Sequence, residues 1–282
     1  MTIKSIAVVG TGLMGKGISQ AFSSYGYKVN VFGRRDDAEM ELQKYLDNEF
    51  KKGRLTPGQK DTIFSNISFY NINLQPEQLS QSDLIIETVK EDMDTKKEVF
   101  DVLSKYARND TVLASNTSSY SIFKLAKNTP FPNNFVGIHF FSPVPVMKLV
   151  EVVKWEENNT EIIQTVCELV RSIDKIPVEV KDSPGFVLNR GLFTMINEAV
   201  YMLDERIANS AEDIDSIFIN GMGMKVGPLK LADLVGIDVV YTIMTNMYEG
   251  FAEEKYKPCR LLKLMVDDGT IGKKASKGFY SY

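Results

Sequence analysis

The sequence predicts an α/β chain, with a doubly wound, mostly parallel sheet followed by a helical carboxyl-terminal domain. Three observations lead to this prediction. In the first half of the chain, short apolar runs alternate with longer amphipathic stretches, as in βαβ units on a parallel sheet. A glycine-rich hexapeptide, residues 10–15, stands between the first apolar run and the stretch that follows it. Beyond residue 185 the apolar patterns are long and helical, with few strand signals.

The elements follow from these patterns in chain order. Ser5–Val9 is a β-branched run that predicts a strand, and Leu13–Tyr25 then has the period of a helix. Further strands are predicted at Lys28–Phe32, Leu84–Thr88, Thr111–Ser115, Phe135–Phe140 and Lys148–Val153, and further helices at Ala38–Lys52, Thr95–Tyr106, Leu192–Glu205 and Gly236–Phe251. The helical stretch near residues 38–60 lies between strands that a short connection would join, so we interpret it as an insertion.

Composition restricts the classes of function. A chain of 282 residues is long enough for two domains with separate cores. The net charge of −4 and the absence of a basic tail argue against nucleic-acid binding. No apolar run approaches the ~20 residues that cross a bilayer, and the apolar start is too short for a signal peptide. With two distant cysteines and one histidine, we expect a cytoplasmic protein without a metal site.

Gly10-Thr11-Gly12-Leu13-Met14-Gly15 matches the pattern G-x-G-x-x-G, with a predicted strand before it and a predicted helix after it. Gly10 permits a tight turn, Gly12 lets the backbone approach a pyrophosphate, and Gly15 lets the helix pack close to the strand. The helix amino terminus at Leu13 and Met14 then presents N–H groups to the phosphates. The motif predicts a Rossmann-type domain that binds a dinucleotide.

The position after the second strand bears on the choice of cofactor. NAD-binding versions of the motif carry a carboxylate there, which accepts hydrogen bonds from the ribose hydroxyls and repels an extra 2′-phosphate. This chain has Gly33, followed by Arg34 and Arg35. Glycine removes the repulsion and opens space, and a guanidinium matches a phosphate dianion. We therefore expect NADP to be preferred over NAD. The alternative is a solvated arginine pair, balanced by the two aspartates that follow, with NAD bound loosely.

Any imidazole chemistry has to run through His139, the single histidine. His139 ends a predicted strand, and the hydroxyl-rich stretch 114–119 follows another, so both should lie at the carboxyl edge of the sheet. A turn through Pro143 and Pro145 would bring the Glu151 carboxylate beside the imidazole. Such a pair suits hydride transfer from an alcohol, because the imidazole takes the hydroxyl proton and the carboxylate fixes its tautomer. The alternative is a buried histidine bonded to backbone and a glutamate paired with a lysine.

Several longer motifs resemble one family. They are Asn116-Thr117-Ser118-Ser119, His139-Phe140-Phe141, the run from Pro143 to Glu151, the run from Asp182 to Arg190, Gly272-Lys273-Lys274 and Gly278-Phe279-Tyr280. At this spacing, and over nearly its whole length, the chain resembles the L-3-hydroxyacyl-CoA dehydrogenases of the 3-hydroxybutyryl-CoA type. The resemblance implies a Rossmann domain, a helical domain that pairs two subunits, and reversible oxidation of a 3-hydroxyacyl thioester to the 3-oxoacyl form.

The resemblance also implies roles for individual residues. His139 would be the acid/base and Glu151 its partner, while Ser118 and Asn189 would hydrogen-bond the reacting oxygen or the thioester. The positions that match cofactor contacts are Glu91, Lys96, Asn116, Ser118, Ser142 and Lys274. From the residues alone, Asn189 is equally compatible with a helix-start side chain that satisfies backbone N–H groups, and Ser118 with a turn hydroxyl.

The chain departs from the family pattern in three places. Ser142 stands where the family usually has Asn, and Gly33 where it has Asp or Glu. The insertion helix is also about one turn, ~3.6 residues, shorter than the resemblance implies. Residues 51–60 carry four basic residues and no acid. Among them, Lys51, Lys52 and Arg54 suit the phosphates of CoA or of a carrier-protein phosphopantetheine arm, although such a run is more often a solvated face.

Asp182-Ser183-Pro184-Gly185 interrupts both periodicities, so we place the domain boundary there. The prediction is an NAD(P)-binding domain over 1–182 and a helical dimerisation and substrate domain over 183–282. The predicted function is reversible hydride transfer between NAD(P) and a short-chain 3-hydroxyacyl thioester. One alternative is a hydroxyacyl-acyl-carrier-protein dehydrogenase of a polyketide extender-unit pathway. Another is a non-catalytic dinucleotide-binding protein, against which the complete set of Ser118, His139, Glu151 and Asn189 argues.

Overall fold

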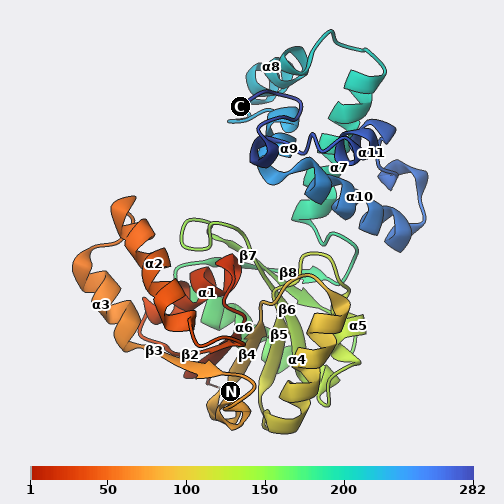
Figure 1. Ribbon diagram of the computed structural model, residues 1–282. Coiled ribbons are helices and arrows are strands. Elements are labelled where there is room, and N and C mark those ends of the chain that lie inside the picture. The colour runs from red at the N-terminus through yellow and green to blue at the C-terminus, as the bar shows by residue number, and fades with distance from the viewer. Residues whose placement is uncertain (1) are drawn as a thin grey trace. The chain divides into compact units, whose positions relative to one another are not determined.

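The computed structural model describes residues 2–282, and the chain divides into two compact units that meet in sequence between Asp182 and Ser183. The first unit contains every named strand of the described chain. The second contains five helices and short 3₁₀ turns. This combination of a Rossmann-type sheet and a helical carboxyl-terminal unit confirms the predicted fold class (Figure 1).

The sheet of the first unit has eight strands in the order β3-β2-β1-β4-β5-β6-β7-β8. Their bounds are Ser5–Val9 (β1), Lys28–Gly33 (β2), Ile67–Asn71 (β3), Leu84–Glu87 (β4), Val112–Ser115 (β5), Phe135–Phe140 (β6), Leu149–Lys154 (β7) and Ile176–Lys181 (β8). All neighbours are parallel except β6 and β7, which are antiparallel. The order reverses at β1, between β2 and β4, and dinucleotides bind at such a point in folds of this kind.

The helices of the first unit connect these strands. They are α1 (Leu13–Ser23), α2 (Ala38–Lys51), α3 (Pro57–Ser65), α4 (Met93–Tyr106), α5 (Ile122–Ala126) and α6 (Thr160–Ser172). The predicted insertion is a hairpin of α2 and α3, visible beside α1 in Figure 1. The periodicity did not predict α3, yet its start is well marked: Thr56 and Gln59 form a capping box, and Pro57 occupies the first turn.

The central strands are buried on both faces, as their uninterrupted apolar runs require. Every residue of β4, β5 and β6 is buried. The parallel register aligns Val9 with Glu87, Glu87 with Ser115, and Ser115 with Gly137. The carboxyl ends of β1, β4 and β5 therefore lie along one edge of the sheet, and the end of β6 extends the same edge.

The second unit consists of α7 (Leu188–Asp204), α8 (Ala211–Met222), α9 (Pro228–Val235), α10 (Ile237–Phe251) and α11 (Arg260–Asp267). Its core surrounds the fully buried side chains of Ile196 and Met244. Buried Asp233 accepts hydrogen bonds from the backbone N–H groups of Phe279 and Tyr280, which ties the chain end to α9. Within residues 2–282, no helix combines the length and the apolar character that crossing a membrane requires.

Candidate active site

The glycine loop packs too closely for any side chain at two of its glycines. A Cβ added at Gly15 would lie 2.0 Å from the carbonyl oxygen of Gly10, so α1 approaches β1 only because residue 15 is glycine. Gly10 has a φ of 122°, and a Cβ there would lie 2.8 Å from the carbonyl oxygen of Thr88. By contrast, a Cβ at Gly12 would have no atom within 4 Å. Gly12 therefore leaves an open approach to the start of α1, where no side chain caps the N–H groups.

A cavity of about 710 Å³ opens at this loop. Its walls are the segment from Val9 to Met14, the end of β2 with the two residues after it (Phe32 to Arg35), and the β4–α4 segment from Thr88 to Lys90, together with Ile72, Thr95 and Val99. The volume is in the range of small-molecule and cofactor sites. An uncapped helix amino terminus at a topological switch point suits a dinucleotide pyrophosphate, so these residues fit the cofactor that the motif predicts.

Gly33, Arg34 and Arg35, which the sequence analysis related to the choice of cofactor, line this cavity. The space at Gly33 is narrower than expected, because a Cβ there would lie 3.0 Å from Cγ2 of Thr11. Both arginines have carboxylate partners: Arg34 Nη2 lies 2.6 Å from Glu98, and Arg35 Nε lies 3.4 Å from Asp37. Pairs at the surface contribute about 0–1 kcal/mol, so these carboxylates hold the two arginines only weakly.

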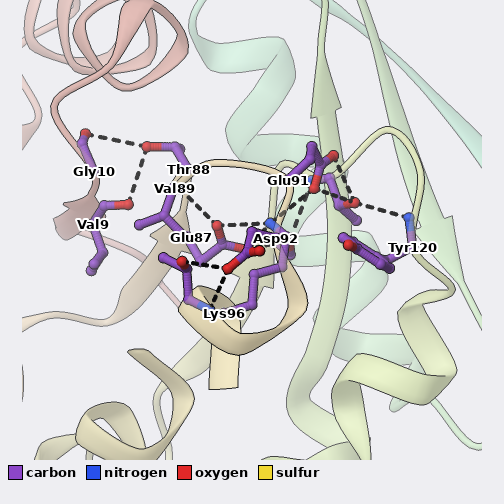
Figure 2. Close-up of polar contacts among 12 residues, drawn as sticks. Val9, Gly10, Glu87, Thr88, Val89, Glu91, Asp92, Lys96 and Tyr120 are labelled. Carbon is purple, nitrogen blue, oxygen red and sulfur yellow. Dashed lines mark hydrogen bonds and ion pairs between the residues drawn. The ribbon is translucent and has the colours of Figure 1, made fainter. Parts of the chain in front are cut away.

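A polar network connects the β4–α4 segment to the loop after β5 (Figure 2). Lys96 is only 1% exposed, and its Nζ donates to both Glu87 oxygens at 2.9 and 2.8 Å and lies 3.1 Å from Glu91. Ser115 also donates to Glu87, at 2.6 Å. Glu87 was not predicted as a site residue. A carboxylate within an apolar strand nevertheless indicates that a charged partner lies beside it, because burying an unpaired charge is unfavourable. Lys96 thus lies behind Glu91, with its donors directed at carboxylates.

Glu91 in turn holds the hydroxyl-rich loop. One of its oxygens accepts from the backbone N–H of Ser118 at 2.7 Å and from the Thr117 hydroxyl at 2.9 Å. Asn116 links the ends of two strands, because its side-chain oxygen accepts from the backbone N–H of Phe140 at 2.9 Å. The structure therefore brings together Glu91, Lys96, Asn116 and Ser118, four residues that the sequence analysis singled out.

His139 and Glu151 face each other across the antiparallel strands β6 and β7. His139 Nδ1 lies 2.8 Å from Glu151 Oε2, and the two residues are 5% and 2% exposed. A carboxylate can only accept, so the imidazole carries its proton on Nδ1 when it makes this bond. The residues are those predicted to pair, and the connection between the strands does bring the carboxylate beside the imidazole.

A second cavity, of about 360 Å³, lies between α2 and the loop after β6. Leu13 and Met14 line it as well as the first cavity, so the two adjoin at the start of α1. Its remaining walls are formed by Tyr45, Asn48, Glu49, Lys52, Arg54, Ser142, Pro143 and Val144. Ser142 and two of the predicted phosphate-binding residues thus share one cavity, whereas Lys51 is exposed and is not among the lining residues.

Three of the four basic residues in 51–60 are paired with acids of α2. Glu49, which is buried, accepts from Lys52 Nζ at 2.9 Å and from Arg54 Nη1 at 2.9 Å, and Lys60 pairs with Asp47. Burial raises the pKa of the Glu49 carboxyl, but the hydrogen bonds and charges of Lys52 and Arg54 outweigh it and hold the pKa below its ordinary value. The sequence analysis gave Lys52 and Arg54 as suited to phosphates or as part of a solvated face, and did not predict their pairing with Glu49.

Asn189 and Lys274 belong to the second unit. Asn189 is buried in the first turn of α7. Lys274 pairs with Asp238 at the start of α10, at 2.6 Å. Neither is among the residues that line the two cavities described above. Taken by itself, the first unit has the glycine loop, the cofactor cavity and the buried His–Glu pair of a dinucleotide-dependent oxidoreductase.

Comparison with known proteins makes this assignment specific. The chain matches the NAD binding domain of 3-hydroxyacyl-CoA dehydrogenase over residues 5–183 and the C-terminal domain of that enzyme over residues 185–282. It is 43% identical over 281 residues to 3-hydroxybutyryl-CoA dehydrogenase of Clostridioides difficile, covering 98% of this chain and 99% of the relative. The crystal structure of (S)-3-hydroxybutyryl-CoA dehydrogenase from Ralstonia eutropha superposes with a TM-score of 0.94 at 37% identity, covering 100% of this chain and 99% of that one.

The similarity extends beyond bacteria. The mitochondrial hydroxyacyl-coenzyme A dehydrogenase of Mus musculus is 34% identical over 288 residues, covering 99% of this chain and 91% of the relative. Both domain matches and the full-length relatives agree with each other. The chain belongs to the 3-hydroxyacyl-CoA dehydrogenase family and is an oxidoreductase.

Proposed function

We propose that the protein catalyses reversible hydride transfer between NAD(P) and a short-chain 3-hydroxyacyl thioester, with His139 as the acid/base and Glu151 as its partner. The observation that carries the proposal is the buried 2.8 Å hydrogen bond between these two side chains at the carboxyl edge of the sheet. The short-chain preference is supported by the similarity to the 3-hydroxybutyryl-CoA dehydrogenases of Clostridioides difficile and Ralstonia eutropha. When bound, the nicotinamide cofactor accepts or supplies the hydride.

The separate roles proposed for His139 and Glu151 follow from the geometry of their hydrogen bond. Because Nδ1 of His139 is bonded to Glu151, Nε2 is the nitrogen that exchanges a proton with the substrate oxygen. In the oxidative direction His139 removes the hydroxyl proton, and in the reductive direction it returns a proton to the 3-oxo oxygen. Glu151 fixes the tautomer and orientation of the imidazole and stabilises the imidazolium that forms.

The surrounding residues orient the reactants. Glu91 accepts from the backbone N–H of Ser118 and, at 3.3 Å, from its hydroxyl, and Asn116 ties the same loop to the end of β6. We assign Ser118 and Asn189 to the reacting oxygen or the thioester. Lys274 is assigned to the cofactor. Lys96 fits a cofactor role through Glu91, since its donors are directed at carboxylates.

We further propose that NADP(H) is preferred. The support is the missing carboxylate at Gly33 and the two guanidinium groups in the wall of the cofactor cavity. Arg34 and Arg35 release only an exposed and a half-buried carboxylate partner when they bind a 2′-phosphate. For the thioester, Lys52 and Arg54 supply positive charge beside the second cavity, and Lys51 adds an exposed charge next to it. Exposed apolar side chains on α8, including Ile217 and Met222, support pairing of two subunits through the second unit.

One assay series tests this function. Steady-state rates are measured for acetoacetyl-CoA and acetoacetyl-acyl carrier protein, each with NADPH and NADH. We expect turnover of the CoA thioester and a higher kcat/KM with NADPH. Equal or higher efficiency with NADH would refute the cofactor preference alone. Turnover restricted to the carrier-protein substrate would replace the CoA assignment by the carrier-protein alternative, and no turnover of either thioester would refute the proposed reaction.

A further inference from the structure

A buried lysine holds the loop that joins β6 to β7. Lys175 immediately precedes β8 and is 7% exposed. Its Nζ donates to the carbonyl oxygen of Val144 at 2.6 Å and to that of Met147 at 2.8 Å. Both acceptors lie in the loop 141–148, more than 25 residues away along the chain.

Placing a charged ammonium group at this buried position costs desolvation free energy. Burial, and then the neighbouring charge of Lys148, lower the pKa of Lys175. An apolar side chain of similar length would fill the same space without desolvating a charge. What lysine adds over such a side chain is its pair of hydrogen bonds to the loop carbonyls.

The loop itself is compact, and β8 holds it at three points. The backbone N–H groups of Val146 and Met147 both donate to the carbonyl oxygen of Pro143, at 3.0 Å each. The N–H of Ile176 donates to the carbonyl oxygen of Lys148 at 2.8 Å. The Lys175 ammonium and the N–H of Ile176 thus hold three carbonyls, those of Val144, Met147 and Lys148, between the middle and the end of this loop.

The same loop forms one wall of the 360 Å³ cavity. Ser142, Pro143 and Val144 line that cavity across from Lys52 and Arg54. Val144 also lies against α1, because a Cβ added at Gly17 would be 2.9 Å from Cβ of Val144. A displacement of the Val144 carbonyl would therefore change the cavity wall and its contact with the helix that begins at the cofactor loop.

We propose that Lys175 is a positioning residue for the active site: its ammonium fixes the β6–β7 loop and so shapes the cavity that receives the thioester. This inference rests on the proposed function for its kinetic consequence. It does not assign Lys175 to the chemical step, because the β6–β7 ladder itself holds His139 opposite Glu151.

The test uses three variants of the full chain. Lys175→Met removes the donors at similar length, Lys175→Arg restores a charged donor, and Lys148→Met is the matched control, an exposed lysine that bonds only Asp174. We expect Lys175→Met to raise the KM for acetoacetyl-CoA about tenfold while kcat changes less than about threefold. Lys175→Arg should recover most of this loss, and Lys148→Met should match the wild type.

Hydrogen exchange of the unliganded variants gives a readout that needs no turnover. Lys175→Met should speed exchange at the amides of Val146 and Met147, with the central strands unchanged. The proposal is overturned if Lys175→Met and Lys148→Met behave alike in both measurements, or if exchange rises throughout the first unit and kcat falls together with the unfolding midpoint. Lack of activity in the wild type would instead refute the proposed function and leave the exchange result to decide the role of Lys175.

Discussion

Replacement of Glu151 by glutamine is the sharpest test of the buried pair. The variant keeps the size of the side chain and an oxygen that can accept from His139 Nδ1, which lies 2.8 Å from the carboxylate now. It removes the negative charge that stabilises the imidazolium. At a charge separation of about 4 Å and an effective dielectric constant of about 20, that attraction is about 4 kcal/mol. One decade in rate corresponds to about 1.4 kcal/mol, so we expect kcat to fall about a thousandfold.

The assay is kcat for reduction of acetoacetyl-CoA, together with cofactor affinity from fluorescence quenching. Cofactor affinity should stay within about twofold of the wild type, because Glu151 is not among the residues that line the cofactor cavity. The matched control is Glu179→Gln on the adjacent strand β8, which removes an exposed carboxylate paired with Lys154 and should leave kcat unchanged. A kcat for Glu151→Gln within tenfold of the wild type would show that the carboxylate does not act through the imidazole.

Two further predictions concern the scaffold of the site. Gly15→Ala places a Cβ 2.0 Å from the Gly10 carbonyl oxygen and should lower the free energy of unfolding by about 3 kcal/mol. Gly12→Ala, whose Cβ would have no atom within 4 Å, should weaken cofactor binding without changing the stability. Equal urea midpoints for the two variants would contradict this prediction. Burial raises the pKa of the Asp83 carboxyl, but two backbone N–H groups and the Arg108 guanidinium outweigh it and lower the pKa. Its contribution to stability is therefore present above about pH 4 and lost as the pH falls through the lowered folded-state value. Asp83→Asn should reduce the difference between the urea midpoints at pH 7 and pH 3, and an unchanged difference would argue against this role.

The sequence was most informative where a pattern repeats over a whole element. The strand predicted at Phe135–Phe140 has the observed bounds of β6, and the helix predicted at Ala38–Lys52 ends one residue beyond α2. The strands β3 and β8 were not predicted, because they are edge strands whose residues are largely not buried and so lack an apolar run. An edge strand is specified by pairing with its neighbour more than by its own pattern.

In the site, as in the fold, features set by neighbouring residues could be predicted, whereas contacts between distant parts of the chain could not. The glycine loop could be predicted because its requirements lie within six consecutive residues. The ion pairs of Lys96 with Glu87 and of Arg54 with Glu49 could not be predicted in this way. The sequence shows which charged residues the chain contains, but not which of them lie next to each other in the fold. Lys96, which matches a cofactor-contacting position, is paired with Glu87 and Glu91, and Arg54 is paired with the buried carboxylate of Glu49.

The antiparallel pair β6–β7 explains how two residues twelve positions apart become a pair. Phe140 ends β6 and Leu149 begins β7, which leaves eight residues for the connection. A parallel crossover takes a dozen residues or more, so this length permits only a hairpin. In a hairpin, directly opposed residues have Cβ atoms about 5 Å apart on the same face of the sheet. His139 and Glu151 are directly opposed in this way, so the one antiparallel pairing within the otherwise parallel sheet brings their side chains into hydrogen-bond contact.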